Sequence, residues 1–245
     1  MIISHAHKFI FIHIPKCGGT SITKALIPLL GKDDIILGFS NSSIFSLIKN
    51  IPSYLNKKYI EKIDLYQGFR QYTRTAINQK ENHGTLISKH SRAMEVKKYI
   101  GSGSWEDYFT FSFVRNPWDR IVSLYYWYQN FNWVDPEGLA TKIRKLPNFD
   151  SFVKSEFLQQ SSCSDFVFDS GERVVDFIGK LENIETDFKN VCNAIGLPEI
   201  QMLKENISQR KRDYREYYNE ETIQLITKQY EDDIKNFNYG FNSSI

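Results

Sequence analysis

The stretch KFIFIHIPKCGGTS, residues 8–21, decides how this chain is expected to fold. Its first seven residues form a short, apolar, β-branched run that stops at Pro15, which is typical of a buried parallel strand. After the two glycines, apolar residues recur three, four and seven positions after Ile22, which predicts a helix that ends near Gly31. The order of strand, glycine turn and helix is the beginning of an α/β fold.

The same order recurs twice further along the chain. A strand is predicted at residues 108–114, followed by a helix with Pro117 at its first position. A second strand at 174–181 precedes a helix at 184–195, and one long helix is predicted at 217–237. Strands that alternate with helices indicate a mostly parallel, doubly wound sheet flanked by helices.

The length and composition favour one domain over residues 1–245, because 245 residues can bury a core and no Pro/Gly-rich linker divides them. About residues 33–88 and 132–170 lack the strand and helix pattern, so we expect irregular or helical insertions that determine substrate specificity. The 31 Lys+Arg and 29 Asp+Glu give a net charge of +2, which gives no indication of a nucleic-acid partner.

The cysteines and the apolar runs predict a cytoplasmic protein. Three widely spaced cysteines without a C-x-x-C pair suggest neither a disulfide framework nor a zinc site. No apolar run near the start approaches the roughly 20 residues of a membrane span. The first residues also lack the basic and apolar regions of a signal peptide.

The turn at residues 14–21 has the donors that a phosphate requires. It lies where a strand leads into a helix N-terminus, whose backbone N–H groups and dipole favour an anion. Lys16 adds a mobile positive charge, and Thr20 and Ser21 add hydroxyl donors. The lysine precedes both glycines, whereas a Walker A loop has it after the second, so a nucleotide kinase is disfavoured. A plain glycine turn with an exposed lysine is the alternative.

The segment RNPWDRIVS, residues 115–123, follows the strand predicted at 108–114. It would lie at the carboxyl edge of the sheet, where ligands bind in doubly wound folds. Arg115 at the strand end and Ser123 two turns into the helix can converge on one phosphate. The alternative is that Arg115 pairs with Asp119 or with surface acids.

Together these segments resemble two motifs of the sulfotransferases. Residues 15–21 resemble the 5′-phosphosulfate-binding motif, and residues 115–123 resemble the 3′-phosphate-binding motif. The residues of both motifs are most similar to those of the branch that includes carbohydrate sulfotransferases of the heparan 2-O and chondroitin types. The segment around His90, residues 177–183 and the basic stretch 210–218 also have counterparts. The resemblance implies a P-loop-like sheet, 3′-phosphoadenosine 5′-phosphosulfate (PAPS) as donor, 3′-phosphoadenosine 5′-phosphate (PAP) as product, and no metal.

The resemblance also implies roles for individual residues. Lys16 would stabilise the bridging oxygen as the 5′-phosphate leaves, and His90 would be the general base, with His83 as its rival. Cys17 is expected to fill space and to have no catalytic role. The expected donor-binding residues are Lys16, Cys17, Gly18, Gly19, Thr20, Ser21, Arg115, Ser123, Arg210, Lys211 and Tyr214.

The expected acceptor is a hydroxyl of a carbohydrate, glycolipid or other glycoconjugate. Two rival functions remain open at this point: a P-loop nucleotide kinase or hydrolase, and a non-catalytic glycan- or nucleotide-binding protein on the same scaffold. Aromatic and basic side chains that could line an acceptor site are Tyr125, Tyr126, Trp127, Tyr128, Phe131, Trp133, Arg70, Arg74, Lys142, Arg144 and Lys145.

Overall fold

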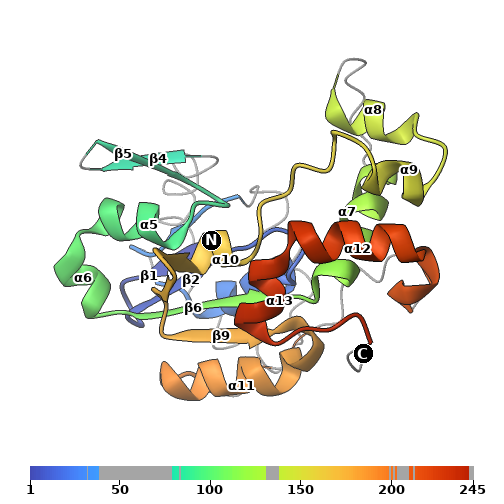
Figure 1. Ribbon diagram of the computed structural model, residues 1–245. Coiled ribbons are helices and arrows are strands. Elements are labelled where there is room, and N and C mark those ends of the chain that lie inside the picture. The colour runs from blue at the N-terminus through green and yellow to red at the C-terminus, as the bar shows by residue number, and fades with distance from the viewer. Residues whose placement is uncertain are drawn as a thin grey trace. The chain divides into compact units, whose positions relative to one another are not determined.

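The chain forms two compact units in the computed structural model, whose ribbon is drawn in Figure 1. The first unit comprises Met1–Phe113 and Phe166–Lys204, and the second comprises Val114–Asp165 and Glu205–Ile245. The prediction of one domain over residues 1–245 stays a prediction. The structure describes residues 1–31, 33–38, 79–82, 84–130, 138–198, 200, 202, 210–211 and 213–242.

A five-stranded sheet forms the centre of the first unit. Its strand order is β3-β1-β2-β6-β9. The strands are β1 (Ile2–Ser4), β2 (Phe9–Ile12), β3 (Ile35–Ile36), β6 (Phe109–Val114) and β9 (Phe177–Lys180).

Most strands of this sheet run in one direction. β2 is parallel to β6, and β1 is antiparallel to both β2 and β3. β9 runs parallel to β6, because the Asp176 amide donates to the Thr110 carbonyl and Gly179, three residues on, lies against Phe113. Four described strands therefore share a direction and β1 opposes them, which confirms the α/β prediction. The doubly wound, P-loop-like arrangement stays a prediction.

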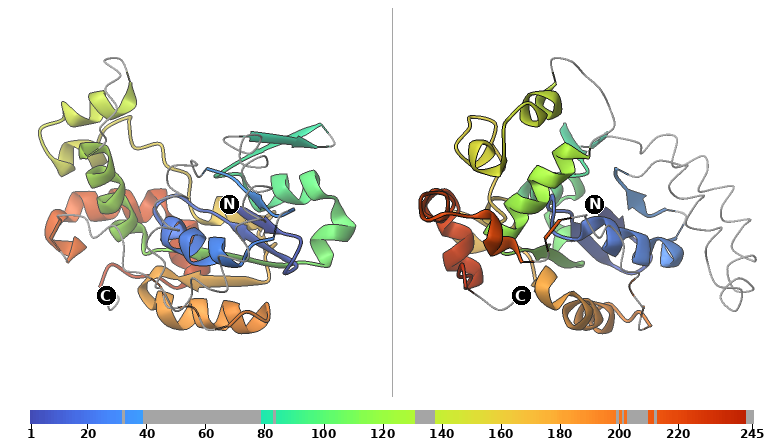
Figure 2. Two further views of the ribbon diagram at one scale, coloured as in Figure 1. Left: turned by 180° about the vertical axis from the view of Figure 1, so that it is seen from behind. Right: turned by 90° about the vertical axis from the view of Figure 1, so that its right-hand side faces the viewer.

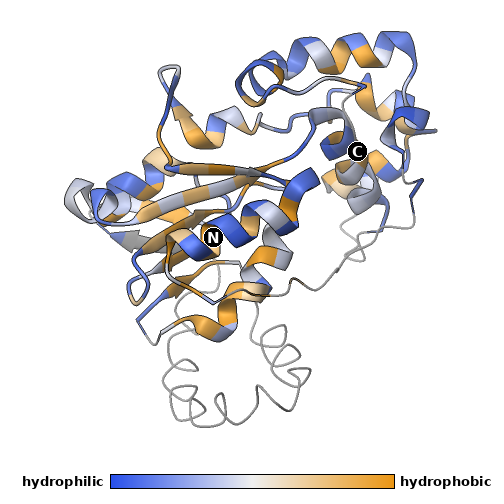
Figure 3. Ribbon diagram, turned by 90° about the horizontal axis from the view of Figure 1, so that it is seen from below, coloured by the Kyte–Doolittle hydropathy of each residue, from blue (hydrophilic) through white to orange (hydrophobic). Residues whose placement is uncertain are grey.

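Alternating phenylalanines explain how the sheet is packed. Side chains two residues apart in a strand share a face, so Phe9 and Phe11 of β2 lie beside Phe109, Phe111 and Phe113 of β6. The ring centroids of Phe11 and Phe111 are 5.1 Å apart. Each buried phenylalanine contributes roughly 1.5–3 kcal/mol to stability. Orange, the hydrophobic colour, accordingly covers much of the strands in Figure 3.

The phenylalanine face is covered by two helices of the first unit, seen beside the sheet in Figure 2. Ile22 and Leu26 come from α1 (Gly19–Leu26), and Phe188 and Val191 from α11 (Ile184–Ala194); all four are in one buried cluster with the strands. Both helices confirm the sequence prediction.

The remaining elements of this unit are η1 (Ile27–Leu29), β4 (Gln79–Asn82), β5 (Thr85–Ser88), α5 (Ala93–Ile100), α6 (Ser102–Glu106), β7 (Phe168–Asp169), β8 (Glu172–Arg173) and η2 (Leu181–Asn183). The helix α10 (Ser164–Val167) begins in the second unit.

The second unit is helical around its own aromatic core. Its longest described helix, α7 (Pro117–Gln129), begins with Pro117 as predicted, and the Asn116 side chain caps it by accepting from the amides of Trp118 and Asp119. Trp118 is buried in this core. The other elements are α8 (Leu139–Arg144), α9 (Phe149–Val153), η3 (Tyr214–Tyr217), α12 (Glu220–Gln229) and α13 (Glu231–Phe237).

The long helix predicted at residues 217–237 was wrong in its extent. The helix breaks at Tyr230, whose φ of −119° is not helical, so α12 and α13 are separate. Tyr230 is buried and its hydroxyl donates to the Gln160 carbonyl at 3.0 Å. Asp233 in the next turn accepts from the amides of Cys163 and Ser164. These tertiary contacts accompany the break, although the apolar register continues across it.

None of the helices in the described part of the chain is both long enough and apolar enough to cross a membrane.

Candidate functional site

The glycine turn of the first unit leads from β2 into α1. Gly18 is the cap residue of α1 and has a φ of +75°, a conformation that glycine adopts without strain. The first hydrogen bond of the helix runs from the Ile22 amide to the Gly18 carbonyl, so the amides of residues 19–21 come before it. Among the described residues, no side chain caps this helix start. A helix start with amides in this position favours an anion, and anion binding by this turn stays a prediction.

Lys16 and Cys17 occupy the middle of this turn. Lys16 is half-buried and has a φ of +66°, in the left-handed region that side chains rarely adopt. Cys17 is buried, and its thiol lies 3.6 Å from the Pro15 carbonyl oxygen. Its expected space-filling role stays a prediction.

His13 lies directly under the helix start. A Cβ atom added to Gly19 would fall 2.3 Å from the His13 ring, so only glycine fits at the first position of α1. The ring is 3% exposed. Burial lowers the pKa of His13 well below its usual value, and the positive charges of the Met1 amino group and Lys89, together with His90, lower it further. His13 is therefore neutral near neutral pH.

His90, the predicted general base, contacts His13. Its Nδ1 lies 2.8 Å from the His13 carbonyl oxygen, and the two rings meet edge-on with centroids 4.9 Å apart. His90 itself is exposed, as a base that must reach a substrate requires. His83, its rival, lies outside the described residues.

Lys89 is a residue that the sequence reasoning missed. Its side chain crosses Gly38 so closely that a Cβ there would lie 2.2 Å from the Lys89 Cδ. Burial lowers the pKa of Lys89. Its only sequence signal was its position beside His90.

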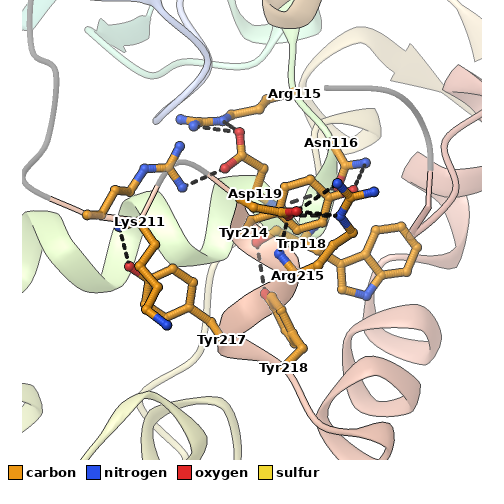
Figure 4. Close-up of polar contacts among 11 residues, drawn as sticks. Arg115, Asn116, Trp118, Asp119, Lys211, Tyr214, Arg215, Tyr217 and Tyr218 are labelled. Atoms are coloured by element: carbon orange, nitrogen blue, oxygen red, sulfur yellow. Dashed lines mark hydrogen bonds and ion pairs between the residues drawn. The ribbon is translucent and has the colours of Figure 1, made fainter.

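The second unit brings two of the predicted arginines together on one carboxylate (Figure 4). Asp119 Oδ2 accepts from Nε and NH2 of Arg115 at 2.8 and 2.7 Å, and Oδ1 lies 2.5 Å from NH1 of Arg210. All three side chains are largely buried, with 10–15% of their surface exposed. The pairing of Arg115 with Asp119 is the alternative that the sequence left open, and the second arginine comes from 91 residues further along the chain.

Ser123 lies on the same face of α7 as Asp119. Residues 119, 123 and 126 are spaced four and three apart, so they line one side of the helix. Asp119 contacts Arg210, and the Tyr126 ring lies 5.6 Å from the Tyr217 ring. The segment that carries Arg210 and Tyr217 thus contacts this side of α7 on both sides of Ser123, which is half-buried.

Tyr214 supports this arrangement from within the core. Its hydroxyl accepts from the Asn116 side chain at 3.1 Å and donates to the Phe241 carbonyl at 2.5 Å. Burial raises its pKa to about 12. Lys211 is exposed; its amide donates to the Tyr217 hydroxyl and its Nζ pairs with Glu216 at 2.8 Å. Donor contacts by Tyr214 and Lys211 stay predictions.

The sequence reasoning missed two features of this region, the second contact of Asp119, with Arg210, and the cap formed by Asn116. Their signals were position: Asp119 is four residues after Arg115, and Asn116 precedes a helix-starting proline. Within the part of the chain that the structure describes, His, Cys, Asp and Glu side chains do not gather in threes that could hold a metal ion.

Comparison with known proteins agrees with the sequence resemblance. The model of the sulfotransferase family matches residues 1–240. An uncharacterized protein of Archaeoglobus fulgidus is 34% identical over 110 residues, which are 44% of this chain and 83% of that protein. No solved structure matches. With nearly its whole length matched, the chain belongs to the sulfotransferase family.

Proposed function

We propose that this protein is an enzyme that transfers a sulfuryl group from PAPS to a hydroxyl of a carbohydrate or glycoconjugate. The observation that carries the proposal is the pair of guanidiniums on Asp119, with Ser123 on the same helix face. Guanidiniums and a hydroxyl are the donors that suit a terminal phosphate dianion. PAPS carries a 3′-phosphate, which ATP lacks.

The glycine turn has the complementary donors for the other end of PAPS. The amides of residues 19–21 and the charge of Lys16 suit the 5′-phosphosulfate. The covalent chain connects the two motifs, since β6 pairs with the strand that leads into the turn and Arg115 is the next residue after β6. Each motif has donors that suit one end of PAPS, and we assign Arg115, Ser123 and Arg210 to its 3′-phosphate.

The proposed chemistry needs few groups from the protein. PAPS supplies a sulfuryl group that is activated by its bond to the 5′-phosphate. His90 removes the proton of the acceptor hydroxyl, because an uncharged hydroxyl is a weak nucleophile. Lys16 and the amides of the turn stabilise the negative charge that develops on the leaving phosphate oxygen.

The proposed acceptor is an anionic carbohydrate. Trp127 is 43% exposed on α7, and aromatic faces often line sugar sites. Lys142 and Lys145 are exposed at the end of α8, where they suit carboxylates of a uronic-acid polymer. Tyr125 and Tyr128 pack on the aromatic core instead. Phe131, Trp133, Arg70 and Arg74 lie outside the described residues.

Calorimetric titration tests the donor. PAP, ATP and ADP are titrated in parallel without magnesium into the wild type, Arg115→Ala and a control, Arg173→Ala, in which an exposed arginine of β8 is removed. We expect PAP to bind most tightly and Arg115→Ala to weaken it about 10- to 100-fold, which is the effect of losing a charged hydrogen bond. Arg173→Ala should bind as the wild type does.

Two results would contradict the proposal. Equal or tighter binding of ATP would favour the kinase or hydrolase alternative. PAP binding without transfer of radiolabelled sulfate to any of a panel of uronic-acid polymers, neutral oligosaccharides and glycolipids would favour the non-catalytic alternative.

A further inference from the structure

The hydrogen bond between His90 and the backbone of His13 determines which nitrogen of His90 carries a proton. The Nδ1 of His90 lies 2.8 Å from the His13 carbonyl oxygen. A carbonyl oxygen can only accept, so Nδ1 must be the donor. In the neutral ring the proton is therefore on Nδ1 and the basic lone pair is on Nε2.

The His13 side chain is packed against both the start of α1 and His90. The ring is 3% exposed, and it contacts Gly19 on one side and the His90 ring on another. The contact with Gly19 is so close that even a methyl group would overlap the ring. His13 is thus in contact with both the helix start and the predicted base.

We propose that His13 is a positioning residue that holds His90 in a fixed place beside the turn and in the tautomer whose Nε2 accepts the proton of the acceptor hydroxyl. The catalytic use of Nε2 rests on the proposed function, whereas the tautomer does not. As the O–H bond of the acceptor breaks, its proton moves to Nε2 and its oxygen forms a bond to sulfur. The bond from sulfur to the 5′-phosphate oxygen breaks, and its electron pair stays on the phosphate.

Nuclear magnetic resonance of the wild type, labelled with nitrogen-15 histidine, tests the tautomer without any substrate. The chain has five histidines, so the spectrum is simple, and the His90 signals are assigned by their loss in His90→Asn. We expect neutral His90 to show the Nδ1–H pattern rather than the Nε2–H pattern that isolated histidine favours. An Nε2–H or averaged pattern in the wild type overturns the inference.

Two variants test whether the His13 ring positions His90. His13→Ala removes the ring, whereas His13→Phe keeps a flat ring next to Gly19 and His90. We expect His13→Ala to lose the single tautomer and to lower kcat about 10- to 100-fold, with the KM for PAPS changed less than about twofold, because a small misplacement of a catalytic group has effects of this size. His13→Phe should restore the tautomer and most of kcat. A single Nδ1–H tautomer and an unchanged kcat in His13→Ala overturn the positioning role.

A pair of His90 variants separates this inference from the proposed function. Asparagine can place its amide nitrogen where Nδ1 lies and donate to the His13 carbonyl, while glutamine extends toward the place of Nε2. We expect both to lose transfer and only His90→Asn to keep the thermal stability of the wild type. If the wild type transfers sulfate but its His90 carries the proton on Nε2, the inference is refuted and the proposed function is not. The expected tautomer in a wild type that neither binds PAP nor transfers sulfate would refute the proposed function and, with it, the catalytic use of Nε2.

Discussion

Asp119 accepts two hydrogen bonds from Arg115 on a single carboxylate oxygen, from Nε at 2.8 Å and from NH2 at 2.7 Å. Its second oxygen is left for Arg210. These three side chains place two guanidiniums and one carboxylate together where they are largely buried. Such a cluster is screened less than a surface ion pair, so the carboxylate keeps the two guanidiniums together.

Asp119→Asn is expected to lower the free energy of unfolding by about 1–3 kcal/mol, because two guanidiniums lose their charged partner. Urea unfolding measures it. The control is Asp232→Asn, an exposed carboxylate at the start of α13, with an expected change of about 0.5 kcal/mol. The loss of free energy caused by Asp119→Asn should be smaller in a protein that already carries Arg210→Ala, because Asp119 then pairs with one arginine instead of two. Equal losses in both backgrounds would show that Asp119 acts independently of Arg210.

Gly19→Ala is expected to destabilise the protein by about 1–3 kcal/mol, because the added methyl group would overlap the His13 ring in a packed core. Gly103→Ala in α6 is the matched control: a Cβ there meets nothing within 4 Å. In a helix that exchange is expected to stabilise by about 0.5–1 kcal/mol. Thermal unfolding of the two variants compares them, and equal melting temperatures would contradict the close contact at Gly19.

The free energy of unfolding should decrease as the pH is lowered, partly because of His13. Its pKa in the folded state is lowered, so below the ordinary value of 6.5 the unfolded chain binds a proton that the folded chain does not. This contribution is complete above about pH 6.5 and is lost as the pH falls, with a slope of up to about 1.4 kcal/mol per pH unit.

Urea unfolding of the wild type and His13→Gln from about pH 8 to pH 5 measures the His13 contribution, because glutamine has no such titration. Lys89, His90 and the Met1 amino group face His13 in both proteins and are common to the comparison. The wild-type free energy of unfolding should fall more steeply below about pH 6.5. Parallel curves would mean that folding does not keep His13 neutral.

Local patterns predicted the parts of the fold whose residues depend on near neighbours. The strands β2 and β6 and the start of α7 at Pro117 were all anticipated, because buried strands and proline-led helices have strong short-range signals. β1 and β3 are only three and two residues long, too short for any periodicity. The break at Tyr230 was missed because contacts with residues 160–164 accompany it, while the apolar spacing continues.

The site was predictable to the same degree. Motif spacing suggested the turn and Arg115, and the resemblance to sulfotransferases suggested His90. The sequence did not show that Asp119 would pair with Arg210, because 91 residues separate the two. Nor could it show that Tyr214 is a buried support for Asn116, since that depends on the packing of the second unit's core.

The backbone of Lys16 has a consequence for protein engineering. A left-handed conformation costs a residue with a side chain about 1–2 kcal/mol and costs glycine almost nothing. Replacement of Lys16 by glycine would therefore remove strain together with the charge assigned to the leaving phosphate. A library screened only for heat resistance is expected to drift toward glycine at position 16, and so to lose the lysine that we assign to the leaving phosphate.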